Sequence, residues 1–233
     1  QIVTRDILVK LMSGAWGTLG VLTEISLKVL PQTETSATLV LHGLSDTDAV
    51  QAMSAALGSP FDVSGAAHLP FLQRTQIRVE GFADSVAYRT EQLQAHLGRF
   101  GTIDVATGDT SASWSSVRDA HAFQNEPGDV WRISVKPSDA PELVASLEAE
   151  QVVYDWGGGL VWVRMSPNTD VRSRMAGVAG HATLVRAASA TIDRLGRFHP
   201  EPEAIARLAD GLRQRFDPKG ILNPGLMHTM IEA

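Results

Sequence analysis

Three glycines near the start of the chain have the spacing expected where a main chain must approach another group closely. In "SGAWGTLGVLTEISLKVLP" (13–31), Gly14, Gly17 and Gly20 recur at every third residue. A missing Cβ permits both a left-handed backbone and close contact with a cofactor. The spacing differs from the dinucleotide-binding G-x-G-x-x-G, which follows a strand and opens a helix, whereas this segment precedes a predicted strand. Two interpretations stay open: a turn packed on a neighbouring strand, or a main chain lying along a bound group.

Two polar side chains are candidates for substrate chemistry. Arg132 in "WRISVK" lies on a predicted central strand between Trp131 and Ile133, where an unpaired guanidinium is costly to bury. The planar guanidinium of Arg132 could bind the carboxylate of a small substrate. Alternatively, it could form an internal ion pair with an Asp or Glu. His181 in "AGHATL" stands at a predicted helix-to-strand turn, where it either meets a substrate or hydrogen-bonds the backbone.

The composition narrows the chemistry further. A net charge of −6 argues against an electrostatic grip on nucleic acid or an anionic membrane. The chain has no Cys, so it can supply no disulfide, thiolate zinc site or iron–sulfur ligand. Its seven His are scattered, the closest pair being His181 and His199, and no H-x-x-H or H-E-x-x-H occurs. We therefore predict no metal site. We also predict no membrane-spanning helix, because no apolar run approaches the ~20 residues that such a helix needs.

The glycine segment leads into a string of elements with clear boundaries. Residues 21–29 alternate as in a half-buried strand, which Pro31 ends. We then predict a strand at 36–44, a helix at 45–58, strands at 61–69 and 75–82, a helix at 83–101 and a strand at 102–107. Ser45 is the expected N-cap of the first helix and Gly58 its C-cap. The apolar face of the second helix is carried by Val86, Leu93 and Leu97.

A second string repeats this order after a Ser/Thr-rich, linker-like stretch at 108–129. We predict a strand at 130–136, a helix at 138–150, strands at 151–156 and 159–165, a helix at 169–180 and a strand at 182–187. Trp156 and the glycines after it form the expected hairpin. Both strings read β-α-β-β-α-β, the ferredoxin-like split motif. The sequence thus predicts an α+β protein in which two such units form one antiparallel sheet with helices on one face.

The tail is predicted to be a helix from residue 201, followed by two tight turns. Ala204, Leu208, Leu212 and Phe216 lie on one face of that helix. "DPKG" then ends the helix, and "NPG" at 223–225 forms a second turn.

Both ends of the chain resemble the vanillyl-alcohol-oxidase (PCMH-type) family of flavoproteins. "LMSGAWGTLGVLTEISLKVLP" is similar to the last part of that family's FAD-binding domain, and "LRQRFDPKGILNPGLM" (212–227) to the closing motif of its FAD-linked oxidases. In between, "DVWRISVKPSDAP", "YDWGGGLVWVRM" and "GHATLVRA" resemble FAD-binding subunits of the bacterial glycolate oxidase type. The resemblance covers essentially the whole chain, and its end motifs are the more specific ones.

The resemblance implies a set of cofactor-binding residues. Gly14, Gly17, Thr18 and Gly20 would let the backbone approach FAD, with Thr18 also able to donate a hydroxyl, and the backbone of Val21 would meet the flavin nucleotide. Asn223 would bring a side-chain amide near the cofactor, although turn chemistry alone would also place an Asn there to cap the turn. The resemblance identifies no catalytic residue, so Arg132 and His181 remain the candidates.

Two family features are missing from the sequence. No P-G-G-x-T-type pyrophosphate loop occurs, and the chain does not begin with Met, so we expect the C-terminal portion of a longer protein with about half of the FAD cradle. This chain would then need the rest of that protein to retain FAD and to be active.

The expected domains are 1–35, the end of the FAD-binding domain; 36–200, an α+β cap or substrate domain; and 201–233, a helix and turn returning to the FAD domain. The H-x-x-H-type metal site of related D-2-hydroxyacid enzymes is also absent, which counts against direct hydroxyacid oxidation.

The leading hypothesis is an FAD-binding subunit of a complex that oxidises glycolate, a 2-hydroxyacid, to glyoxylate. The resemblance implies a second flavin subunit and an iron–sulfur subunit as partners, and a location in the cytoplasm or at the inner-membrane periphery through the complex. Two alternatives stay open. One is a non-catalytic assembly subunit of the same complex. The other is a small-molecule-binding module, since tandem ferredoxin-like units also occur in regulatory domains.

Overall fold

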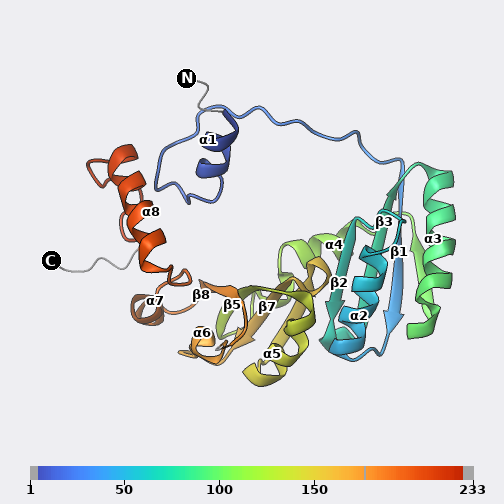
Figure 1. Ribbon diagram of the computed structural model, residues 1–233. Coiled ribbons are helices and arrows are strands. Elements are labelled where there is room, and N and C mark those ends of the chain that lie inside the picture. The colour runs from blue at the N-terminus through green and yellow to red at the C-terminus, as the bar shows by residue number, and fades with distance from the viewer. Residues whose placement is uncertain (1–4, 176, 228–233) are drawn as a thin grey trace. The chain divides into compact units, whose positions relative to one another are not determined.

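The computed structural model describes residues 5–175 and 177–227 of the chain (Figure 1). It divides into two compact units. Unit 1 joins the N-terminal residues up to Leu30 with those from Ser189 onward, and unit 2 runs from Pro31 to Ala188. Within the described residues, no helix has the length and apolar character needed to cross a membrane. His228 and the rest of the predicted tail beyond 227 lie outside the described residues.

Unit 2 is built on an eight-stranded antiparallel sheet with the strand order β4-β1-β3-β2-β6-β7-β5-β8. Its first half consists of β1 (Thr35–His42), α2 (Asp46–Leu57), β2 (Gly65–Leu69), β3 (Arg74–Gly81), α3 (Ala83–Leu97) and β4 (Ile103–Thr107). Its second half consists of β5 (Asp129–Val135), α5 (Ala140–Leu147), β6 (Gln151–Asp155), β7 (Leu160–Met165), α6 (Val171–Arg174) and β8 (Gly180–Arg186). The two halves meet where β2 pairs with β6, at His68 opposite Tyr154, and this junction is called the seam below. The predicted α+β class, antiparallel sheet and element order are confirmed.

The local sequence explains the first helix of unit 2. Ser45 caps α2 by accepting the backbone N–H of Asp48, and Gly58 is the C-cap residue, as predicted. The face of α2 against the sheet consists of small residues and one Met: Ala49, Val50, Ala52, Met53 and Ala56. Small side chains allow the helix to lie close to the strands. In α3 the predicted apolar face is also confirmed, with Val86, Leu93 and Leu97 all buried.

The predicted linker at 108–129 is wrong, and so is the prediction that all helices lie on one face. This stretch forms α4 (Ser111–Arg118) and a 3-10 turn, η3 (His121–Phe123). His68 on β2 faces Asp46 of α2, whereas its neighbour Ala67 packs in one cluster with Trp114 of α4. Because successive strand residues point to opposite faces, α4 covers the face that α2 does not.

The reason for that error lies in the composition of the stretch. The Ser- and Gly-rich residues resemble a linker, yet Trp114, Val117 and Phe123 are buried against Val130 and Val153 of the sheet. Trp114 also donates its indole N–H to Thr38 Oγ1 on β1 at 3.0 Å. Three well-placed large side chains therefore anchor a segment whose average composition is polar.

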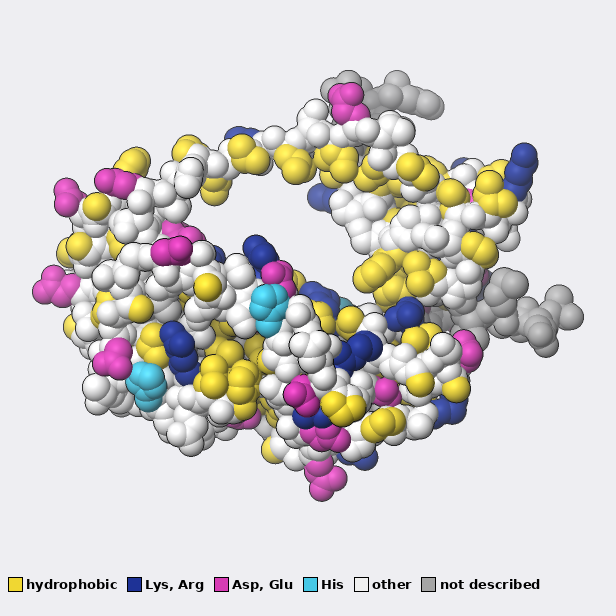
Figure 2. Space-filling model, turned by 180° about the vertical axis from the view of Figure 1, so that it is seen from behind, with side chains coloured by type: hydrophobic (Ala, Val, Ile, Leu, Met, Phe, Trp, Pro, Cys, Tyr) yellow, Lys and Arg dark blue, Asp and Glu magenta, His cyan; other side chains and the backbone are white. Residues whose placement is uncertain are grey.

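The predicted strand at 21–29 is also wrong. Residues 19–30 form no strand and make no backbone hydrogen bond with any described residue. Hydrophobic side chains remain exposed along this segment (Figure 2), with Val21 at 78% and Leu27 at 79% exposure. The alternating pattern favours a strand, but a strand needs a partner ladder, and none of the described strands supplies one.

Unit 1 contains three helices among its described residues: α1 (Arg5–Met12), α7 (Ser189–Leu195) and α8 (Glu203–Phe216). The predicted tail helix corresponds to α8, but its apolar stripe is exposed at Leu208, Leu212 and Phe216. The predicted helix at 169–180 shortens to the four residues of α6. Short 3-10 turns complete the chain at η1 (Pro70–Leu72), η2 (Gly98–Phe100), η4 (Pro137–Asp139) and η5 (Trp156–Gly158).

Candidate functional site

The glycine loop and the tail turn, more than 200 residues apart in sequence, meet within unit 1. Asn223 donates its side-chain amide to the carbonyl of Trp16 at 2.9 Å. A Cβ on Gly17 would lie 2.8 Å from Asn223 Nδ2, so this contact requires glycine there, and Gly17 also has φ +71°. Gly14, at φ +82°, has a left-handed backbone as well. The structure thus brings together two of the segments on which the flavoprotein resemblance depends.

The other residues of the glycine loop play different parts. Thr18 is buried, and its hydroxyl donates to the Ala15 carbonyl at 2.7 Å. Its O–H is therefore committed within the loop, and its side chain fixes the loop's shape. Gly20 lies against Met12, since a Cβ there would be 3.1 Å from the Met12 methyl. Val21 is exposed, and its backbone N–H and C=O are unpaired among the described residues.

The tail turn that carries Asn223 is organised by Asp217. The Asp217 carboxylate accepts the backbone N–H of Leu222 at 2.7 Å. Backbone N–H groups of Leu222, Ile221, Gly220 and Lys219 lower the pKa of this carboxyl. Because an ionised carboxylate accepts these N–H groups best, the turn is fixed at neutral pH.

A cavity of about 1070 Å³ in unit 1 is bordered by this turn. Asn223 and Met227 line it, together with Phe198 and Arg213. Phe198 packs edge-on against Trp16 of the glycine loop, with ring centroids 5.4 Å apart. A glycine loop with free main-chain groups, an Asn amide and an adjoining cavity fit a dinucleotide cofactor of the FAD type.

Arg132 lies on β5 in unit 2, half-buried, with its guanidinium 5.3 Å above the ring of Trp156. It has no ion pair with any described Asp or Glu. The alternative of an internal ion pair is therefore wrong. A cation on an aromatic face keeps its charge while its in-plane N–H groups remain available.

His181 lies near the start of β8 and is exposed. It stands opposite Ser134 in the β5–β8 ladder, while Arg132 stands opposite Thr183. Residues two apart on neighbouring strands share a face, so Arg132 and His181 lie on the same face as diagonal neighbours. No hydrogen bond of the His181 side chain occurs among the described residues, so the proposed bond to the backbone is absent.

Two features of unit 2 were missed by the sequence reasoning. The first is a polar network at the seam. His68, fully buried, places Nδ1 2.9 Å from Thr75 Oγ1 and Nε2 3.3 Å from Asp46 Oδ1, and the Tyr154 hydroxyl donates to Asp46 Oδ2 at 2.7 Å. The hydrogen bonds from His68 and Tyr154 lower the pKa of Asp46 against the opposing effect of burial, while burial and the bond to Asp46 raise that of Tyr154. In the sequence, the only indication of this network is the presence of single polar residues within apolar strands.

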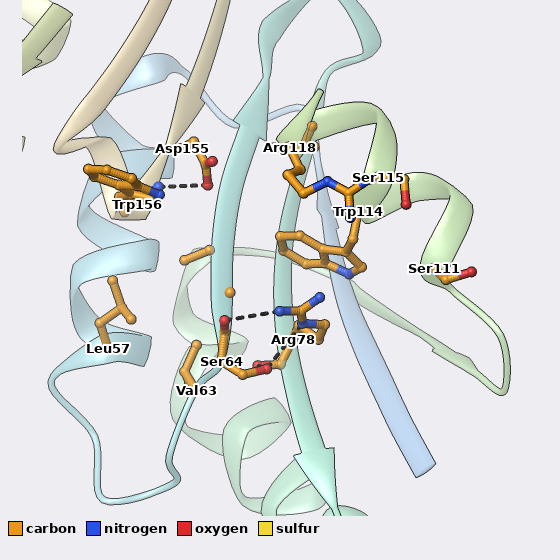
Figure 3. Close-up of a pocket in the computed structure, with 14 residues that line it drawn as sticks. Leu57, Val63, Ser64, Arg78, Ser111, Trp114, Ser115, Arg118, Asp155 and Trp156 are labelled. Atoms are coloured by element: carbon orange, nitrogen blue, oxygen red, sulfur yellow. Dashed lines mark hydrogen bonds between the residues drawn. The ribbon is translucent and has the colours of Figure 1, made fainter. Parts of the chain in front are cut away.

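The second missed feature is a pocket of about 530 Å³ on the α4 face of the sheet, beside the seam (Figure 3). Arg78 and Trp114 lie on one side of it, and Asp155 and Trp156 at its upper edge. Burial raises the pKa of the Asp155 carboxyl, while the Trp156 N–H and the charge of Arg78 oppose the rise. No sequence pattern predicts this pocket, because one of its walls is α4, whose composition is typical of a linker.

No described group of three or more His, Asp or Glu side chains is arranged to hold a metal ion.

Comparison with known proteins identifies a relative of this chain. No protein-family model matches the chain. Glycolate oxidase subunit GlcE of Escherichia coli (strain K12) is 35% identical over 222 residues, which cover 94% of this chain and 57% of GlcE. The chain thus spans little more than half the length of that relative. The chain is a homologue of the glycolate oxidase subunit GlcE.

Proposed function

We propose that this chain is the C-terminal part of an FAD-binding subunit in a complex that oxidises glycolate or a similar 2-hydroxyacid. One observation carries the proposal: the Asn223–Trp16 hydrogen bond joins the two end segments that resemble flavoprotein motifs. The homology to a glycolate oxidase subunit supports it.

In this proposal unit 1 supplies part of the FAD site. Gly14, Gly17, Gly20, Val21 and Asn223 would hold the cofactor, and Thr18 would contribute by fixing the shape of the loop. The glycines allow close approach, and the unpaired main chain at Val21 provides hydrogen-bonding groups. Asn223 uses one amide N–H on Trp16, which orients its Oδ1 and second N–H. When bound, FAD supplies the two-electron acceptor for oxidation of an alcohol to a carbonyl.

Unit 2 would act as the substrate-binding cap, made of two ferredoxin-like halves. Arg132 would bind the carboxylate of the hydroxyacid, because its guanidinium rests on Trp156 without an acidic partner. His181, exposed on the same face, would accept the proton of the substrate hydroxyl. Oxidation of glycolate to glyoxylate releases two electrons and two protons, so a base and an electron acceptor are both needed.

The electrons must then leave through other chains. An iron–sulfur cluster needs thiolate ligands, and this chain contains no Cys. We propose that an iron–sulfur subunit and a second flavin subunit are the partners, in the cytoplasm or at the inner-membrane periphery.

The test is an absorbance spectrum of the full-length subunit, purified without the second flavin subunit, before and after anaerobic addition of glycolate. We expect flavin bands that bleach with glycolate. Flavin bands in this subunit that persist would instead indicate an assembly subunit with a structural cofactor. If this subunit carries no flavin, a small-molecule-binding module becomes the better explanation.

A further inference from the structure

The pocket on the α4 face of unit 2 is separate in its residues from the proposed hydroxyacid-binding pair. Figure 3 shows Leu57, Val63 and Trp156 on one side and Trp114, Arg78 and Arg118 across from them. Neither Arg132 nor His181 lines it, although Trp156, whose ring carries the Arg132 guanidinium, does. At about 530 Å³ the pocket is within the size range of small-molecule sites.

Arg78 is the less exposed of the two arginines that line this pocket, and it has N–H donors to spare. Its Nε donates to Ser64 Oγ at 3.1 Å and its Nη2 to the Ser64 carbonyl at 3.2 Å. Nε also lies 3.0 Å from Glu80. The two N–H groups on Nη1 have no partner among the described residues. Arg118 likewise donates from Nε and Nη2 to both oxygens of Asp119, but its side chain is 72% exposed, against 27% for Arg78.

The position of Arg78 is fixed by its surroundings. Its guanidinium carbon lies 4.9 Å from the centroid of the Trp114 ring, and Ser64 holds the other end of the fork. A guanidinium held in one orientation loses little entropy when it binds an anion. The hydroxyls of Ser111 and Ser115 on α4 also border the pocket and can donate to an anion's oxygens.

Part of the wall is apolar, beside the polar lining residues Asp155, Arg118 and the three Ser. Val63, Leu57 and Val117 contribute aliphatic surface, and Trp114 contributes its ring. Gly65 also lines the pocket and lets Trp114 pack closely on β2, because a Cβ there would lie 3.0 Å from the Trp114 ring. The orientation of Arg78 beside this apolar surface matches a ligand with one anionic group and a compact apolar body, and Asp155 at the edge would repel a second anionic group.

We propose that this pocket binds a small organic carboxylate with a compact apolar body, with Arg78 and not Arg132 as the residue that holds the carboxylate. Its lining residues come from both halves of unit 2: Val63 and Arg78 from the first, Asp155 and Trp156 from the second. The halves are joined by a single paired position, His68 opposite Tyr154. A ligand in the pocket therefore contacts both sides of the seam and stabilises it, as an effector would.

The probe is benzoate, which carries one carboxylate on one ring, and its neutral analogue benzamide is the matched ligand control. Binding to the full chain is followed by tryptophan fluorescence and by the rise in Tm. The key variants are Val63→Asp and Val63→Asn, which differ at one pocket position only in charge. Arg78→Gln removes the proposed anchor, and Arg99→Gln, an exposed arginine outside the pocket, is its control.

We expect saturable binding of benzoate that is weakened at least ~10-fold by Arg78→Gln, the loss of a charge-assisted hydrogen bond. Val63→Asp should weaken it several-fold more than Val63→Asn, while Arg99→Gln and Arg132→Gln leave it unchanged. Val63 is only partly buried, so its variants test the site even if Arg78→Gln fails to fold.

Three results would overturn the proposal: no saturable binding of benzoate, equal binding of benzamide, or equal affinity of Val63→Asp and Val63→Asn. Loss of binding in Arg132→Gln would assign benzoate to the proposed hydroxyacid site instead. None of these readouts requires flavin or glycolate oxidation, so failure here and failure of the proposed function are separate outcomes.

Discussion

The two units of this chain differ in how much apolar surface they bury by themselves. Apart from Ala15, every buried hydrophobic residue among those described belongs to unit 2. Unit 1 is instead held by polar turn contacts, such as those of Thr18, Asp217 and Asn223, and α8 has no buried residue. Unit 2 therefore owes its stability to its own core, whereas the local structure of unit 1 depends on a few hydrogen bonds.

The largest expected difference comes from a matched pair of Leu→Ala substitutions. Leu39 on β1 has 0% exposure and Leu27 in the extended segment 79%. We expect Leu39→Ala to cost about 2–5 kcal/mol of unfolding free energy, because it removes apolar contacts and leaves a cavity. Leu27→Ala should change it by less than about 0.5 kcal/mol. Urea denaturation followed by circular dichroism measures both, and equal costs would remove the contrast between the units.

A smaller effect is expected at the seam. Tyr154→Phe removes the hydroxyl that donates to Asp46 at 2.7 Å, and we expect a loss of about 1–2 kcal/mol, typical of a hydrogen bond to a charged group. Tyr88→Phe is the control, since Tyr88 is exposed and its hydroxyl makes no hydrogen bond with a described residue. The same denaturation assay applies. A loss no greater than that of Tyr88→Phe would mean that the network does not stabilise the junction.

The same network predicts a pH dependence. Hydrogen bonds from His68 and Tyr154 lower the folded-state pKa of Asp46 below its ordinary 3.8. The unfolded state therefore takes up the proton first, so the stabilisation is complete above pH ~4 and is lost as the pH falls through the folded-state pKa. We expect the stability cost of Asp46→Asn to be smaller at about pH 3.5 than at pH 7. A cost that is the same at both pH values would argue against an ionised Asp46 in the network.

The smallest stability change is expected at Asn223 in unit 1. Asn223→Ala removes an exposed hydrogen bond to Trp16, which should cost about 0.5 kcal/mol. FAD affinity of the whole subunit should nevertheless fall, because the turn and the glycine loop lose their link. Titration of FAD followed by its fluorescence measures this loss. A large loss of stability with unchanged FAD affinity would contradict the assignment of Asn223 to the FAD site.

The sequence predicted unit 2 much better than unit 1. In unit 2 most elements, with α4 as the exception, carry their own signal, such as the Ser45 cap or the buried face of Val86, Leu93 and Leu97. In unit 1 the alternating residues of 21–29 carry an equally clear strand signal, but the described residues supply no partner strand for it. A periodic pattern indicates which side chains are apolar on one face, but it does not identify the segment that packs against them.

The candidate sites show the same limit. The glycine loop and Asn223 were found because turn chemistry and the family resemblance both mark them. From the sequence, Arg132 could be either ion-paired with an acidic residue or available to a substrate. Its packing on Trp156 without an acidic partner, seen only in the structure, favours the second alternative. The pocket around Arg78 could not be predicted, because one wall is α4, whose Ser-rich residues obscure the burial of Trp114.

The division of roles between the units is tested most directly by Arg132→Gln in the protein assembled with its partner subunits. The measurement is the FAD content of the subunit together with the glycolate concentration that half-saturates anaerobic flavin reduction. We predict unchanged FAD content and a half-saturating concentration at least ~10-fold higher, because a charge-assisted carboxylate contact is lost. An unchanged glycolate dependence, or a loss of FAD, would contradict the assignment of substrate binding to Arg132 in unit 2.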